Sequence, residues 1–210
     1  MAETKTRPNR RELQKAKTRQ RIQEHAIRLF LERGFDETTV EDIVAAVGVS
    51  HMTFFRNFRT KEDVAVSDDY DQLIVRLVME RPAEEPLLER LRHALVDGMR
   101  GVAPEAQATL LAQSRLILDT PALHGRMLEN QYATLAKVVA ALVEEAGPTA
   151  DVLTTRVVVA AALAAAATGL VAWVESDGLE PPALMVDRAL IALRDHVAES
   201  VVGVPAKNTR

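Results

Sequence analysis

The sequence contains no cysteine among its 210 residues. A disulfide framework, a thiolate nucleophile and a cysteine metal site are therefore excluded. Aromatic residues make up only 4% of the chain, and β-branched runs with alternating polarity are absent. Because alanine, leucine and valine dominate instead, the composition favours helices over sheet, and we expect an all-α fold.

Patterns typical of enzymes and metal sites are also missing. The chain has no glycine-rich phosphate-binding loop, and its five histidines are far apart, at positions 25, 51, 93, 124 and 196. Asp68, Asp69 and Asp71 form the only acidic cluster. Neighbouring positions on a helix point in different directions, so we interpret this cluster as a solvated acidic face. We expect no enzyme activity, catalytic residue, metal or cofactor.

Charge is distributed unevenly along the chain. Residues 1–62 contain 13 Lys and Arg against 9 Asp and Glu, a net charge of +4. Residues 63–210 contain 13 against 21, a net charge of −8. Positive charge confined to one end is expected when only that end meets a polyanion. Charge alone fits a solvated basic face equally well.

Residues 157–174 carry no charge and are long enough to suggest a membrane-spanning helix. Much of this run is alanine, which contributes little to membrane insertion. Small residues also let helices approach closely, so we prefer a buried helix at a subunit interface and expect no membrane partner. The basic N-terminus is not followed by the apolar core of a secretory signal, and we expect a cytoplasmic protein.

Turn and capping residues divide the chain into about nine predicted helices. They cover residues 11–33, 39–46, 50–58, 60–81, 85–102, 104–119, 121–146, 151–177 and 181–202. Prolines 104, 121 and 181 stand at helix starts, where the missing N–H has the smallest effect. We find no internal repeat.

Residues 39–58 have the pattern of a helix-turn-helix. Thr39 and Ser50 cap the two helices, and Gly48 stands in the turn, where it can take a left-handed conformation. The apolar residues of the inner faces are Val40, Ile43, Val44, Val47, Val49, Phe54 and Phe58. Their packing would leave the N-terminal end of the second helix free to enter a major groove.

This segment resembles the DNA-binding signature of the tetracycline-repressor (TetR) family. The resemblance is carried by residues 39–43 (TVEDI), 48–50 (GVS), 53–55 (TFF) and 58–62 (FRTKE), and by the helix before them. It implies a three-helix DNA-binding domain in residues 1–62, with an N-terminal arm. A helical ligand-binding and dimerisation domain would follow in residues 63–203, and a disordered tail in 204–210. The function implied is that of a transcriptional regulator, most often a repressor.

The resemblance also implies roles for single residues. Thr39, Thr53 and Lys61 match positions that hold phosphates, and Thr18 and Arg19 stand at the head of the first helix, after a basic arm. The arm would strengthen binding without much sequence choice. The alternatives are a solubilising tail and, for Lys61, simple solvation of a helix start.

Base reading is expected at the start of the second helix of the motif. Ser50, His51 and Met52 lie there, and Met52 can offer only apolar contact, for instance to a thymine methyl group. Phe55 stands where the family often has a tyrosine that touches phosphate, so we expect it to pack against the sugar backbone. An ordinary solvent-exposed histidine is the alternative for His51.

The resemblance implies a homodimer through helices 151–177 and 181–202. The first of them is apolar on nearly every face, which is unfavourable on the surface of a monomer. Ala161, Ala165 and Gly169 lie four apart and permit close helix contact. A twofold dimer would bind a palindromic DNA operator.

A sensing pocket is expected among the middle helices, for a small and largely apolar effector. The candidates are Met79, Met99, Arg115, Leu116, Met127, Asn130, Gln131, Tyr132 and Trp173. Residues 115–123 (RLILDTPAL) also resemble a sensing subgroup associated with acyl-coenzyme-A-like ligands. The effector would tilt the predicted helix 60–81 and change the spacing of the two recognition helices. A DNA-binding protein without a small-molecule effector is the alternative.

Overall fold

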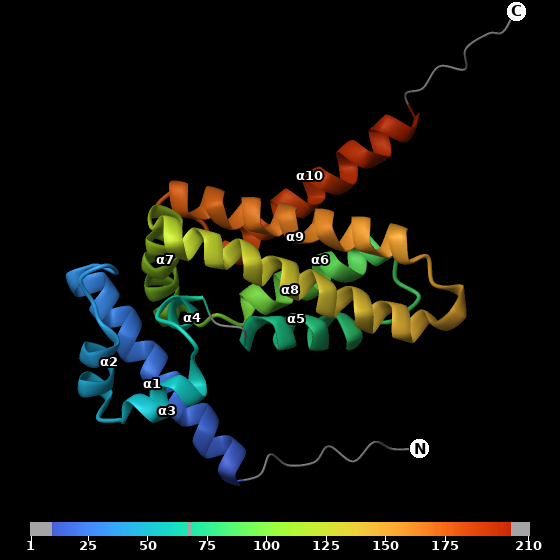
Figure 1. The fold of residues 1–210 in the computed structure, drawn as a ribbon. Coiled ribbons are helices and arrows are strands. Elements are labelled where there is room, and N and C mark those ends of the chain that lie inside the picture. The colour runs from blue at the N-terminus through green and yellow to red at the C-terminus, as the bar shows by residue number, and fades with distance from the viewer. Residues whose placement is uncertain (1–9, 67–68, 203–210) are drawn as a thin grey trace, which may run out of the picture. The chain divides into compact units, whose positions relative to one another are not determined.

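The computed structural model describes residues 10–66 and 69–202, without the side chains of 12–13, 69–70, 104–105 and 197–202. All regular structure in these residues is helical (Figure 1). The helices are α1 (Arg10–Arg33), α2 (Val40–Val47), α3 (His51–Asn57), α4 (Glu62–Ala65), α5 (Asp69–Met79), α6 (Leu87–Arg100), α7 (Pro104–Asp119), α8 (Pro121–Ala146), the 3-10 helix η1 (Gly147–Thr149), α9 (Val152–Glu175) and α10 (Pro182–Val202). The predicted all-α class is confirmed. The predicted tail and residues 1–9 lie outside the described residues, whereas the rest of the basic arm, predicted over residues 5–21, is the first part of the helix α1 and is not extended.

One predicted helix is wrong, because residues 60–81 form two separate helices. The four-residue α4 ends at Ala65, and α5 begins at Asp69. Val64, Ala65 and Val66 follow one another and are all buried. The backbone of Val66 has φ −113° and ψ 85°, outside the helical region, so the helix ends before it. The continuous helix that we expected to connect the helix-turn-helix with the ligand-binding domain therefore does not exist.

The chain forms two compact units, which we describe separately. The first comprises residues 1–67 and 116–127, so it includes the end of α7 and the start of α8. Its core is built from α1 to α4, and Ile22, Phe30, Ile43 and Phe54 are almost fully buried in it. Leu123 from α8 is equally buried in the same cluster. A short segment distant in sequence therefore completes the core around the helix-turn-helix.

The second unit comprises residues 68–115 and 128–210. Its core brings together apolar residues of α5, α6, α8, α9 and α10. Helices α9 and α10 approach each other closely at Gly169, where a Cβ atom would lie 2.7 Å from the Met185 carbonyl oxygen and 2.9 Å from the Val186 Cα. The small residue at position 169 thus permits close helix contact as predicted, and its partner is α10 of the same chain.

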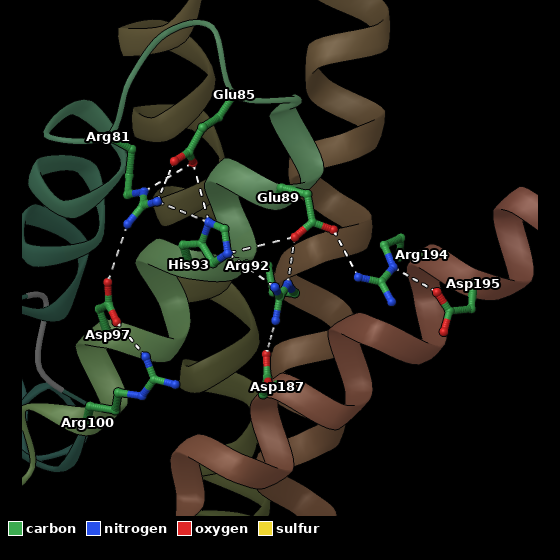
Figure 2. A network of polar contacts seen from close by, with 10 residues as sticks. All are labelled: Arg81, Glu85, Glu89, Arg92, His93, Asp97, Arg100, Asp187, Arg194 and Asp195. Atoms are coloured by element: carbon green, nitrogen blue, oxygen red, sulfur yellow. Dashed lines mark hydrogen bonds and ion pairs between the residues drawn. The ribbon is translucent and has the colours of Figure 1, made fainter.

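A network of charged side chains joins α6 to α10 on the surface of the second unit (Figure 2). Arg92 of α6 pairs with Asp187 of α10, and Arg194 of α10 reaches back to Glu89 of α6 at 3.4 Å. His93 lies beside Glu89 at 3.9 Å and beside Glu85 at 3.4 Å. Arg92 and Arg194 bind the Glu89 carboxylate and lower its pKa. These pairs hold the two helices together outside the apolar core.

Helix α9 is long and apolar enough to meet the criteria for a membrane-spanning helix. The mean hydropathy of its most apolar window is 2.3, and 39% of that window is buried within the chain. A core helix of a soluble protein passes the same test, so one such helix is weak evidence for a membrane span.

Candidate nucleic-acid interface and sensing residues

Capping residues fix both ends of α2. The Thr39 hydroxyl accepts a hydrogen bond from the Asp42 N–H at 3.1 Å, and the Asp42 carboxylate accepts from the Thr39 N–H at 2.9 Å. The Thr39 hydroxyl also donates to the Asp42 carboxylate at 2.6 Å, and this bond and the one from the Thr39 N–H lower the pKa of Asp42. At the other end Gly48 has φ 74°, and its N–H donates to the Val44 carbonyl at 2.9 Å. The predicted capping and turn residues are confirmed, and they hold α2 in a defined orientation.

The next helix, α3, exposes the end that we expect to read DNA. Ser50 caps it by accepting from the Thr53 N–H at 3.2 Å. Phe54 and Phe58 are 0% and 2% exposed and fix the inner face against the core. On the outer face the exposed fractions of Met52 and Phe55 are 62% and 53%. Two large apolar side chains on a solvated helix are available for contact with a partner.

His51 is held by an acidic residue of the preceding helix. Its Nε2 lies 3.2 Å from Glu41 Oε1, and both side chains are exposed. A hydrogen bond from its own backbone and then the one from His51 lower the pKa of Glu41. If Nε2 donates to Glu41, Nδ1 of a neutral ring is an acceptor. Glu41, which was not predicted as a site residue, therefore influences which hydrogen-bonding groups His51 presents on the exposed surface of α3.

Three cationic side chains of the first unit bind backbone carbonyl groups, two of them at the ends of helices and the third in the connection between α1 and α2. Arg21 donates to the Val47 carbonyl at the end of α2 at 3.0 Å, and Arg19 donates to the Asn57 carbonyl at the end of α3. Lys61 donates to the carbonyls of Phe35 at 2.7 Å and Thr38 at 2.9 Å. Cations at helix C-termini are stabilising because the unpaired carbonyls carry partial negative charge.

Aromatic rings complete the surroundings of two of these cations. The Arg19 guanidinium lies 4.1 Å from the centre of the Phe58 ring, and the Lys61 ammonium lies 4.1 Å from that of Phe35. A lysine ammonium has three N–H donors, of which the two carbonyls use two. One N–H donor of Lys61 thus stays available for the predicted phosphate contact. The binding of the two carbonyls is a structural role of Lys61 that the sequence did not indicate.

A surface hollow of about 400 Å³ lies between α1 and α3. It is lined by Gln14, Lys15, Thr18, Thr53, Arg56 and Asn57. The hollow thus brings together the two predicted threonines, although Thr18 already donates to the Gln14 carbonyl at 3.0 Å. The Asn57 amide donates to the Thr53 carbonyl at 2.7 Å, while its buried oxygen has no partner in the part of the chain described. Arg56, which the sequence analysis did not select, adds positive charge here.

The predicted sensing residues do not form one cluster. Met99 and Trp173 are buried in the second unit, and Met79 is half-buried against the same core. Tyr132 is 74% exposed, whereas Asn130 and Gln131 are half-buried.

Three further candidates lie where the chain passes from one unit to the other, at residues 115–116 and again at 127–128. Leu116 and Met127 pack against the core of the first unit. Arg115 belongs to the second unit, where it pairs with Asp177 and donates to the Val174 carbonyl at 3.3 Å. These candidates are therefore divided between the two units.

The interpretation of Asp71 as part of a solvated acidic face is wrong. Asp71 is fully buried, and its carboxylate accepts hydrogen bonds from the Thr134 hydroxyl and, at 2.8 Å, from the Lys137 ammonium. A buried carboxylate requires such partners. The sequence analysis missed this pair because both partners lie more than 60 residues further along the chain. The Asp68 residue and the Asp69 side chain lie outside the described part.

Two family models match the chain. Residues 22–67 match the model of bacterial regulatory proteins of the tetR family, and residues 85–198 match the MftR C-terminal domain model. The chain is also 34% identical over 150 residues to the HTH-type transcriptional regulator TcmR of Streptomyces glaucescens. The match covers 64% of this chain, and the chain spans 64% of the length of that relative.

Solved structures share the fold. The fatty acid degradation regulator FadR from Bacillus halodurans matches with a TM-score of 0.57 and 21% identity, covering 84% of this chain and 94% of that one. SmeT in complex with triclosan matches with a TM-score of 0.51 and 18% identity, covering 92% and 98%. The tetR family model covers the helix-turn-helix, and the C-terminal domain model covers more than half of this chain. The chain therefore belongs to the TetR family of transcriptional regulators, which are not enzymes.

Proposed function

We propose that this chain is a ligand-responsive repressor that binds a palindromic operator as a homodimer in the cytoplasm and is released by a small, largely apolar effector. The observation that carries the proposal is the rigid helix-turn-helix, in which both short helices are capped and α3 turns Met52 and Phe55 outward. The net positive charge of the first 62 residues also supports binding to DNA.

The dimer is proposed from the apolar surface of α9 and α10. Leu153, Val157 and Leu184 are 73%, 58% and 41% exposed in the single chain. Large apolar side chains that gather on one pair of helices indicate a surface that another chain covers. A twofold partner would bring two recognition helices to successive major grooves.

The proposed effector response uses the segment of residues 116–127. This segment belongs to the unit of the helix-turn-helix, where Arg126 donates to Asp63 at 2.7 Å. Asp63 in turn accepts from the N–H groups of Arg59 at 3.1 Å and Thr60 at 3.2 Å, just before α4. An effector that moves α7 or α8 would therefore reach α4 through this pair, without the continuous helix expected from the sequence.

Two experiments test the proposed function. Selection from random double-stranded DNA by the purified chain should enrich one palindromic sequence, and enrichment of none would contradict the proposal. Apolar compounds are then screened for release of that sequence, since the fold can hold a small organic molecule, as in SmeT with triclosan.

Arg126→Gln should weaken release of the DNA by an active compound while leaving binding of that compound intact. Equal release from both proteins would contradict the route through Asp63.

A further inference from the structure

Trp173 of α9 has a buried hydrogen-bond donor that finds no acceptor. The side chain is 1% exposed, and within the described residues its indole Nε1 has no hydrogen-bond partner. Buried polar groups in native proteins are nearly always paired, and each exception requires an explanation.

A glycine turn covers the indole nitrogen. The Gly178 N–H donates to the Trp173 carbonyl at 3.0 Å, and this folds the chain back over the ring. A Cβ atom at Gly178 would lie 3.5 Å from Trp173 Nε1 and 2.9 Å from a methyl group of Leu111. Gly178 and the tip of Leu111 therefore lie near the indole nitrogen, and neither gives it a hydrogen-bond acceptor.

The turn of residues 177–178 also contacts α7, and its first residue has a positive φ. Asp177 has φ 53°, which is unfavourable for a residue other than glycine. Arg115 of α7 binds the Asp177 carboxylate and also donates to the Val174 carbonyl at 3.3 Å. Leu111 lies one turn before Arg115 on the same helix. Both contacts between α7 and this turn are thus made by one face of α7, and both would be lost together if α7 moved.

We propose that the Trp173 indole N–H is the donor that binds a carbonyl oxygen of the effector after the turn of residues 177–178 and α7 move away. The ligand class is a small apolar molecule with one carbonyl acceptor. A single neutral N–H between Leu111 and Gly178 suits an uncharged oxygen. The inference rests on the proposed effector response, for which it names the ligand chemistry.

The position of this site on α7 links it to the DNA-binding unit. Arg115 is the last residue of α7 assigned to the second unit, and the following residue, Leu116, packs against the core of the first. A ligand that separates Arg115 from Asp177 therefore acts on the helix directly before it enters the unit that carries the helix-turn-helix.

The single tryptophan of the chain makes the test direct, because its indole gives the only ¹H–¹⁵N indole signal. The full chain is titrated with cyclohexanone and, as the matched probe, with methylenecyclohexane, in which CH₂ replaces the oxygen. We expect cyclohexanone to move the indole signal downfield saturably and to bind about tenfold more tightly than the hydrocarbon. Equal affinities, or an unmoved signal at the solubility limit of cyclohexanone, would overturn the inference.

Two variants separate the hydrogen bond from packing. Trp173→Phe keeps an aromatic ring without the N–H, and it should bind both probes equally. Arg115→Gln releases the turn and should bind cyclohexanone more tightly than the unchanged protein does. A ketone preference that survives in Trp173→Phe would overturn the inference.

DNA selection by the same preparations without any probe distinguishes failure of the inference about Trp173 from failure of the proposed function. A palindromic sequence selected by a chain that shows no ketone preference overturns the inference alone. Failure to select any sequence overturns the proposed function on which the inference rests.

Discussion

Single side chains of the first unit serve both the fold and the proposed DNA contact. Arg19, Arg21 and Lys61 all bind carbonyl groups at helix ends or in the connection before α2. The same charges lie in the part of the sequence with net positive charge. Substitution of such a residue should change stability and DNA affinity together, so both must be measured.

Lys61→Ala should weaken binding to all DNA and lower the salt dependence of binding by about one ion. The physical reason is the loss of one cation whose third N–H donor can reach a phosphate. The variant should also melt at a lower temperature, because the Phe35 and Thr38 carbonyls lose their donor. Salt titrations and thermal melting measure the two effects. An unchanged salt dependence would refute the phosphate contact.

His51→Ala should relax sequence choice while leaving affinity for random DNA nearly unchanged. The ring lies at the exposed start of α3, where base edges are expected, and Glu41 holds it by a 3.2 Å contact. Affinities for a selected operator and for random DNA give the comparison, with Lys61→Ala as the matched control. If both substitutions reduce specific and random binding equally, the assignment of the two roles is wrong.

At the scale of elements, the close contact between α9 and α10 is a specific weak point. Gly169→Ala should destabilise the chain by about 1–3 kcal/mol, since the new Cβ would meet the backbone of residues 185–186. Gly125→Ala is the matched control, because that helical glycine has open space around it and should gain roughly 0.5–1 kcal/mol. Urea unfolding measures both. Equal and favourable changes would show that the helices are not in close contact.

The ion pairs between α6 and α10 predict how stability depends on pH. Arg92 and Arg194 lower the pKa of Glu89 in the folded chain below its ordinary value of 4.5. The stability that these pairs contribute is therefore complete at neutral pH and is lost as the pH falls below about 4.5. Arg92→Met should flatten this part of the dependence of the unfolding free energy on pH. An identical acid dependence in the variant would contradict the contribution of the network.

At the scale of the whole molecule, the sequence predicted the helix-turn-helix well because its signals are local. Thr39, Gly48 and Ser50 act within three or four residues of themselves, so their capping roles could be predicted from spacing alone. The end of α4 at Ala65, followed by the non-helical backbone of Val66, has no comparable local signal in the sequence. The Asp71–Lys137 pair joins positions far apart in sequence.

For the sensing residues, the sequence indicated only the types of residue to expect, and it did not indicate which unit each residue belongs to. Leu116 and Trp173 are both apolar residues of the middle or late helices, but the first belongs to the DNA-binding unit and the second to the other unit. No local pattern distinguishes the two cases, because the division of α7 between the units depends on packing against the core around Leu123.

The mass of the complex between the chain and its selected operator shows whether the chain binds a palindromic operator as a dimer. Native mass spectrometry on the selected palindrome should give two chains per DNA duplex, and a duplex with one half-site scrambled should bind much more weakly. This result would agree with a twofold regulator joined through α9 and α10. One chain per duplex with equal affinity for scrambled DNA would contradict the account.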